Sequence, residues 1–331
     1  MAVIPPWPGC NSVLLLTCLF CLGSCTTLKQ NRQTQYLIPA NLPVAAELSS
    51  TPFFPQTANH CGPASLATIL RSHNIDVTPE SLTASLYIPE RKGSLQVEMT
   101  AATRQYGMLP YPINPDFSNL LTEIAAGHPV LVLQNLRFEW WPKWHYAVAI
   151  GYDIENSEIV LRSGTTRRWL TTFDTFIKTW NRADNWALVI VPAGKIPATA
   201  TASSYLKTAH ALEETGFNRY ALAAYRAATM KWPDNPDTWI TLGNMAYKNG
   251  APGEAVSALM QASVLAPENA IAWNNLAYAL HACGCTAQAL ESLRCAHELS
   301  PDDPNIRDSE DEIRNKIQQP RAVDCPQIRC N

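Results

Sequence analysis

The chain has 331 residues, of which 47% are hydrophobic, and a formal net charge of −3 at neutral pH. This length and composition suit two packed globular domains. The small net charge and the lack of a basic cluster argue against nucleic acid as a partner.

The amino terminus has the features of an export signal. Residues 13–22 form an apolar run that is too short to cross a bilayer, which needs about 20 residues, and that is typical of a signal-peptide core. The run ends in Leu-Gly-Ser before Cys25, which resembles the bacterial lipobox. The resemblance implies a signal peptide over residues 1–24, lipidation of Cys25 and membrane attachment through this lipid. A signal peptide cleaved without lipidation, or a short hydrophobic anchor, is the alternative.

The residue after Cys25 is Thr26 and not Asp, which favours an outer-membrane lipoprotein of the bacterial cell envelope, facing the periplasm. Residues 25–50 contain Gln-rich and Pro-containing stretches without strong apolar periodicity. We therefore expect them to form a tether between the membrane and the first domain.

Residues 56–70 contain the pattern of a nucleophilic cysteine. Gln56 lies five residues before Cys61, and Gly-Pro and an apolar helical pattern follow the cysteine. Because Pro63 suits the first turn of a helix, Cys61 is expected at the helix N-terminus. Unpaired N–H groups and the helix dipole there favour a thiolate, and the Gln56 amide is a candidate oxyanion donor. The alternative is a small buried cysteine that begins an ordinary helix.

The candidate general base is His145, at the entrance of a β-rich run over residues 144–153. A neutral imidazole there would accept the thiol proton and later return it to the leaving amine. His60 adjoins Cys61, but adjacent side chains in such a segment usually diverge. The remaining histidines lack a comparable position.

The order Gln, Cys-Gly-Pro-Ala, then His-Tyr-Ala-Val-x-Ile-Gly-Tyr-Asp resembles the cysteine peptidases of family 39, which remove double-glycine leaders from bacteriocins and belong to the papain-like superfamily. The resemblance covers about residues 50–192. It implies a Cys61–His145 pair, Gln56 in the oxyanion hole, and an Asp or Asn that orients the histidine. Ser163 takes the place of this third residue; its hydroxyl fixes a tautomer but does not offset imidazolium charge. Asp153 would lie about 26 Å from His145 along the strand and is a poor substitute.

Helices are expected first and antiparallel strands later, which defines an α+β papain-like domain over residues 51–192. Trp140, Trp141 and Trp144 either wall a substrate cleft or fold onto the core as a surface loop. Asn135 and Arg137 are candidate cleft residues by their position at a strand exit. The expected helices cover residues 61–72, 79–86, 95–106, 117–126 and 173–181, and the expected strands cover 129–134, 144–153, 158–162, 168–170 and 186–191.

After a linker over residues 193–204, the chain repeats itself with a period of 34 residues, which is typical of tetratricopeptide repeats. Three repeats over residues 205–302 predict an all-α solenoid, followed by a capping helix and tail over 303–331. The concave groove of such a solenoid would bind an extended peptide or a partner protein. The columns in register are Tyr205, Trp239 and Trp273; Gly216, Gly250 and Gly284; Ala221, Ala255 and Ala289; Ala228, Ala262 and Ala296; and Pro233, Pro267 and Pro301.

Five cysteines lie in the C-terminal part, at positions 283, 285, 295, 325 and 330. An oxidising compartment permits disulfides. Cys325 with Cys330 is the most local pairing, although the connectivity stays open. Cys283, Cys285 and Cys295 lack a fourth ligand at a familiar spacing, so we expect no metal and no other cofactor.

The leading hypothesis is a membrane-tethered cysteine peptidase that acts on a peptide or protein substrate, with the repeats docking a substrate or partner. Two alternatives stay open. One is a non-catalytic envelope scaffold that binds peptides, and the other is acyl transfer from the same thioester to an amine. The substrate and the cleavage site are left undetermined.

Overall fold

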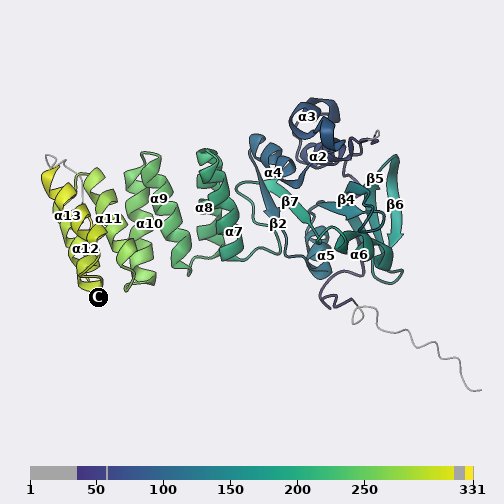
Figure 1. The fold of residues 1–331 in the computed structure, drawn as a ribbon. Helices are drawn as coiled ribbons and strands as arrows, with labels where there is room; N and C mark the ends of the chain where they lie inside the picture. Colours follow the sequence, from purple (N-terminus) through teal and green to yellow (C-terminus); the bar gives the residue numbers. More distant parts are fainter. Residues whose placement is uncertain (1–35, 57–58, 317–324, 331) are drawn as a thin grey trace, which may run out of the picture.

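A computed structural model describes residues 36–56, 59–316 and 325–330, and shows an α+β domain followed by a row of helices (Figure 1). The expected fold class is confirmed. The elements of the first domain are β1 (Ala45–Glu47), α2 (Cys61–Ser72), α3 (Pro79–Leu86), η1 (Pro89–Arg91), α4 (Gln96–Gln105), β2 (Met108–Pro112), α5 (Phe117–Ala125), β3 (Val130–Asn135), β4 (Trp144–Asp153), β5 (Glu158–Ser163), β6 (Thr166–Thr172), α6 (Phe173–Asn181) and β7 (Ala187–Pro192).

The strands form one antiparallel sheet in the order β2-β7-β3-β4-β5-β6, and β1 also pairs with β4. Helices cover both faces of this sheet. Tyr146 and Val148 of β4 pack with the residues of α2, α3 and α4, whereas Ala147 and Ala149 pack with those of α5 and α6. Because successive side chains of a strand point to opposite faces, β4 is apolar on both sides and lies at the centre of the domain.

Two strands were not expected from the sequence. β2 contains Pro110 and Pro112, and proline argues against a central strand; β2 lies at the sheet edge, where proline is tolerated. β1 lies in the expected tether. The tether prediction is wrong for residues 36–50, because Ile38 is buried in the core and the Tyr36 ring packs on Phe173.

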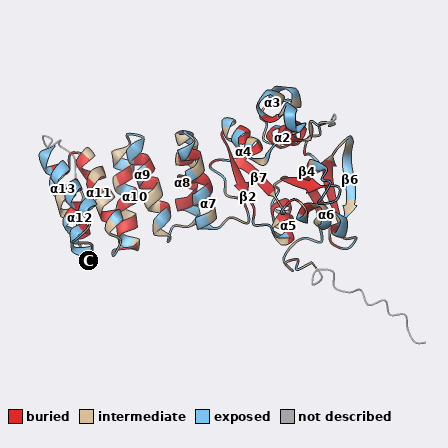
Figure 2. Ribbon diagram, in the orientation of Figure 1, coloured by how far each residue is buried: buried red, intermediate tan, exposed pale blue. Residues whose placement is uncertain are grey.

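In its described residues, the second domain contains three antiparallel helix pairs and one further helix. Gly216, Gly250 and Gly284 have φ values of +85°, +73° and +88° between the two helices of each pair, so the glycine column marks turns that need the left-handed region. Buried residues follow the faces at which neighbouring helices meet (Figure 2). The helices are α7 (Ala202–Glu214), α8 (Asn218–Lys231), α9 (Pro236–Lys248), α10 (Pro252–Leu265), α11 (Ala270–Ala282), α12 (Thr286–Leu299) and α13 (Pro304–Asn315).

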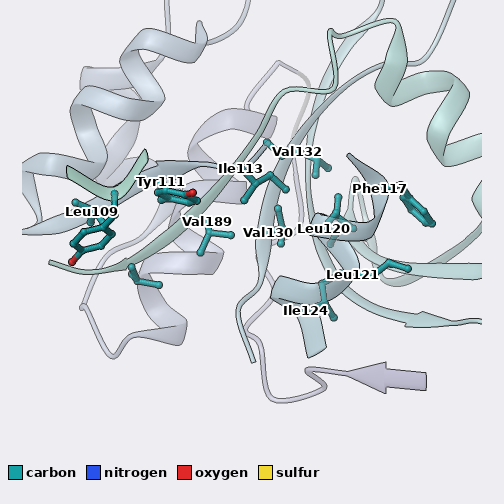
Figure 3. Packing of buried hydrophobic residues seen from close by; sticks show 14 of the residues in the cluster. Leu109, Tyr111, Ile113, Phe117, Leu120, Leu121, Ile124, Val130, Val132 and Val189 are labelled. Atoms are coloured by element: carbon teal, nitrogen blue, oxygen red, sulfur yellow. The ribbon is translucent and has the colours of Figure 1, made fainter. Parts of the chain in front are cut away.

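The two domains share one hydrophobic core. Leu109 and Tyr111 of the edge strand β2 belong to the same cluster as residues of α5 (Figure 3) and as Tyr205 and Ala209 of α7. The Tyr111 hydroxyl also lies 2.8 Å from Ser204 Oγ. The first helix of the solenoid, α7, therefore packs directly against the edge strand β2 of the first domain.

The linker is held by a buried carboxylate. Glu123 of α5 accepts hydrogen bonds from the Thr199 N–H at 2.7 Å, the Thr199 hydroxyl at 2.6 Å and the Ala198 N–H at 3.1 Å. Its Oε2 also lies 2.7 Å from Nδ1 of His128. The segment that connects the domains is thus fixed to the first domain by several polar contacts.

Two disulfides connect the C-terminal tail to the last repeat. Cys285 pairs with Cys325 and Cys295 pairs with Cys330. The local pairing of Cys325 with Cys330 is therefore wrong, because each of these cysteines lies beside a cysteine of the last helix pair. Within the described ranges, no helix is long and apolar enough to cross a membrane.

Candidate active site

Cys61 is the first residue of α2, and its thiol is free and partly buried. The helix packs against β4, and Gly62 through Leu70 are buried. The backbone N–H groups of Tyr146, Gly62 and Cys61 itself lie close enough to the sulfur to lower the pKa of its thiol. These contacts place the thiol between the start of α2 and the first residues of β4.

Burial raises the pKa of the Cys61 thiol, and the three backbone N–H groups lower it by less than burial raises it. The expectation that the helix start favours a thiolate is therefore wrong for this structure. Removal of the sulfur from water disfavours the charged form more strongly than the N–H groups stabilise it. A thiol in this state needs a base before it acts as a nucleophile.

His145 is the second residue of β4, opposite Gln134 of β3. Its Nε2 lies 2.8 Å from the hydroxyl of Ser163, the last residue of β5. Burial, with a smaller effect of the Lys143 charge, lowers the pKa of His145 to about 4. The imidazole is therefore neutral at neutral pH, and when Nε2–H donates to Ser163, Nδ1 carries the free lone pair.

Cys61 lies beside the first residues of β4, the strand that carries His145. The Tyr146 N–H that reaches the sulfur belongs to the residue directly after His145. Within the described ranges of the chain, no hydrogen bond joins the sulfur to the imidazole. The two side chains thus lie at the same end of β4 without direct bonding in this state.

Gln56 connects three elements beside Cys61. Its Oε1 accepts a hydrogen bond from the Gly164 N–H at 2.9 Å, and its Nε2 donates to Ser65 Oγ at 3.2 Å and, less closely, to the Tyr146 carbonyl at 3.4 Å. Ser65 lies four residues after Cys61, on the same side of α2. Both N–H donors of the Gln56 amide are therefore in use, and donation to an oxyanion requires the amide to exchange a partner.

Asn135 has a different role from the expected one. The side chain is only 1% exposed. Its Oδ1 accepts hydrogen bonds from the N–H groups of Arg137 at 3.0 Å and Lys143 at 2.9 Å, and its Nδ2 donates to the Phe138 carbonyl at 3.3 Å. Asn135 therefore organises the β3–β4 hairpin, and its amide is not available in a cleft.

The tryptophans of this hairpin are exposed. Trp140, Trp141 and Trp144 are 79%, 60% and 54% exposed, and the Phe138 ring stacks on Trp140. The alternative in which this loop folds onto the core is excluded by these values. The hairpin displays aromatic side chains next to His145, because Trp144 directly precedes it.

Asp153 binds Asn156 at the far end of β4, so it has no part in orienting His145. Cys25 lies outside the described residues. Within residues 36–56, 59–316 and 325–330, no group of three His, Cys, Asp or Glu side chains is arranged to hold a metal ion. Sequence reasoning did not single out Ser65 and Gly164, the partners of Gln56; the i+4 spacing of Ser65 from Cys61 was the available signal for the first.

Comparisons with known proteins agree with this architecture. Residues 48–188 match the model of the Peptidase_C39 like family, and residues 206–267 match that of the tetratricopeptide repeat. The first domain is therefore similar to the Peptidase_C39 like family, and the helices that follow it are similar to tetratricopeptide repeats. No curated protein matches the chain significantly.

The solved structures that match include an O-GlcNAc transferase mutant of Thermobaculum terrenum, at 27% identity, covering 34% of this chain and 22% of that chain, with a TM-score of 0.32. The present chain thus spans less than a quarter of that protein. The first tetratricopeptide domain of Spaghetti, bound to an HSP90 peptide, matches at 17% identity over 34% of this chain and 90% of its own, with a TM-score of 0.33. The Yersinia enterocolitica type III secretion translocator chaperone SycD matches at 17% identity over 36% and 96%, with a TM-score of 0.33.

Proposed function

We propose that this protein is a membrane-tethered cysteine peptidase. The observation that carries the proposal is the position of the Cys61 sulfur beside the Tyr146 N–H, one residue from the neutral, Ser163-bound imidazole of His145. The proposal requires side-chain rotation to bring the thiol and the unprotonated ring nitrogen together. The proposed mechanism is therefore general-base activation of a neutral thiol and not a preformed ion pair.

The proposed reaction begins when Nδ1 of His145 takes the thiol proton and the sulfur attacks the peptide carbonyl. The amine then leaves with the proton from His145, and water hydrolyses the resulting thioester. The Cys61 N–H and the Gln56 amide would stabilise the oxyanion. Ser163 would keep Nε2 as the protonated nitrogen of the ring.

Substrate and partner contacts are proposed at two surfaces. The exposed tryptophans of the β3–β4 hairpin adjoin His145 and suit contacts with an unfolded polypeptide. The second surface is a hollow of about 430 Å³ in the repeat domain, suited to an extended segment of a substrate or partner. Its lining residues are Asn244, Tyr247, Leu259, Asn275, Tyr278 and Glu312.

The proposed location is the bacterial cell envelope, with a lipid on Cys25 as the anchor. The two disulfides of the C-terminal tail support this location, because disulfides persist in oxidising compartments and are rare in the cytosol. Radiolabelled palmitate should enter the wild-type protein in a bacterial host but not the Cys25→Ser variant.

The decisive experiment compares Cys61→Ala with Cys283→Ala, since these are the two free cysteines among the described residues. Incubation with an envelope peptide library and mass spectrometry of the products should show cleavage by the wild type and by Cys283→Ala, and none by Cys61→Ala. A Cys61→Ala variant that still cleaves the same peptides would remove Cys61 from the mechanism.

A non-catalytic peptide-binding scaffold is the second candidate. It is favoured by the raised thiol pKa and by the Gln56 amide, whose donors are already occupied. In that case the library should be bound but not cleaved. A Ser163→Asp variant that also lacks turnover would favour this candidate over the peptidase.

A further inference from the structure

Three polar atoms near the start of α2 are buried without a hydrogen-bond partner: Ser94 Oγ, Glu98 Oε2 and the Tyr146 hydroxyl. Buried polar groups are usually paired, because an unpaired one has lost its water without compensation. Several buried polar atoms with unused hydrogen-bonding capacity around one point therefore favour a site for a polar or charged group.

These atoms lie around Cys61. Ser94 Oγ is 2.5 Å from the position that a Cβ on Gly62 would occupy, so it lies directly against the residue after Cys61. Tyr146 is 2% exposed and faces the α2–α4 layer, and its own N–H contacts the Cys61 sulfur. Glu98 lies in the first turn of α4. Ser94, Glu98 and Tyr146 are named here the polar recess.

The polar recess combines one carboxyl group with two hydroxyl groups. Burial, and then the charges of Cys61 and Glu98, raise the pKa of Tyr146, so its phenol stays protonated at neutral pH. Glu98 has no ion-pair partner among the described residues. Burial lowers the pKa of Arg104 on the same helix, and the charge of Glu214 in the repeat domain raises it by less.

We propose that the polar recess binds a positively charged group of the substrate, a lysine or arginine side chain next to the scissile bond. A lysine ammonium has three N–H donors and no acceptor, and the recess offers three oxygen atoms without partners. Since these atoms are covered in the present state, Ser94 and its segment move off Gly62 when the cation enters. The preference for basic peptides rests on the proposed peptidase function. Attraction of a cation to the polar recess does not depend on that function.

The first experiment measures charge preference at Cys61 without a peptide substrate. Aminoethyl, hydroxyethyl and sulfonatoethyl methanethiosulfonates each form a mixed disulfide with the Cys61 sulfur and release methanesulfinate. Rates are followed by intact mass spectrometry in a Cys283→Ser background. The cationic reagent should react about tenfold faster than the neutral one, as expected for attraction by a close, partly buried carboxylate. Glu98→Gln should bring this ratio to about one, and Tyr146→Phe should lower it.

Glu90→Gln is the matched control, because Glu90 is an exposed carboxylate on η1, shortly before Ser94. This variant should keep the wild-type ratio. An equal ratio in the wild type, Glu98→Gln and Glu90→Gln would overturn the proposal and leave ordered water as the partner of the three atoms. Circular dichroism of Glu98→Gln checks that the variant is folded.

The second experiment uses fluorogenic peptides that differ only in Lys, Arg, Gln or norleucine at the residues flanking the scissile bond. Faster cleavage of the basic peptides by the wild type, lost in Glu98→Gln, supports the proposal. Cleavage without such a preference overturns the recess proposal and leaves the peptidase function intact. Absence of all cleavage, with the reagent preference still present, overturns the peptidase function and retains the cationic recess.

Discussion

The imidazole of His145 is held by a hydroxyl, with 2.8 Å between its Nε2 and Ser163 Oγ. A serine orients the ring but brings no negative charge to it. This explains why burial lowers the pKa of His145 to about 4 without opposition from a partner charge. The pair is therefore suited to a neutral resting state.

Ser163→Asp should give the imidazole of His145 a negatively charged hydrogen-bond partner. We expect the pKa of His145 to rise, because an adjacent carboxylate favours imidazolium, and the acidic limb of kcat/KM to move to higher pH. Ser163→Ala should lower kcat/KM by about tenfold or more through loss of ring orientation. Thr165→Ala, at an exposed residue of the turn between β5 and β6, is the control. An acidic limb at the same pH in all three variants would contradict the assigned role of Ser163.

Alkylation of Cys61 should be slow at neutral pH. Because burial raises the pKa of this thiol, its rate of reaction with iodoacetamide should increase steadily through the alkaline range without a plateau near pH 7. The measurement is a pH series followed by peptide mass spectrometry, with Cys283 as an internal reference. A plateau below pH 8 would indicate a thiolate–imidazolium pair instead.

The neutral His145 should make folding sensitive to mild acid. The unfolded chain binds a proton near the ordinary pKa of 6.5, whereas the folded chain does so only near 4. The free energy of unfolding is therefore unaffected above about pH 6.5 and falls as the pH is lowered from 6.5 to 4, by at most about 3 kcal/mol. Urea unfolding at several pH values should show this loss, and His145→Gln should remove it.

Glu123→Gln should weaken the attachment of the linker. Burial raises the pKa of Glu123, but the hydrogen bonds from His128 and Thr199 outweigh it and the net pKa is lowered. The carboxylate thus stabilises the fold at neutral pH, and this contribution is lost as the pH falls below 4.5. We expect the substitution to cost about 2 kcal/mol at pH 7, measured by urea unfolding. Glu139→Gln, on the exposed β3–β4 hairpin, should leave the free energy of unfolding unchanged. An equal loss of stability in both variants would refute the role of Glu123 in holding the linker.

The tail disulfides should stabilise the last repeat. They close loops of 40 and 35 residues, and removal of one should cost about 2–4 kcal/mol. Thermal unfolding of Cys285→Ser and Cys295→Ser checks this, with Cys283→Ser as the control. Peptide mapping without reduction should recover Cys285 linked to Cys325 and Cys295 linked to Cys330. Recovery of a Cys325–Cys330 peptide would contradict the structure.

Much of the fold was predictable because local sequence patterns, such as helix caps, apolar periodicity and repeat spacing, indicate its helices and repeats. The helices over Pro79–Leu86 and Phe173–Asn181 begin and end where the sequence predicts, since each has a proline or an N-cap threonine at its start and an apolar face. The repeats were predictable from five columns of residues, the glycines among them, at a constant spacing of 34 residues. Strand β2 was not predictable, because its two prolines are typical of a loop. Proline is tolerated there only because β2 lies at the edge of the sheet.

By itself, the sequence determined which residue types are available: a cysteine at a helix start, a histidine at a strand entrance, a serine on the next strand and a helical repeat. Only the tertiary structure decided their chemical states and partners. Burial between α2 and β4 opposes ionisation of Cys61, the hairpin uses the amide of Asn135, and the tail cysteines bond to the last repeat. Desolvation and the proximity of residues far apart in sequence depend on packing, and no local pattern encodes them.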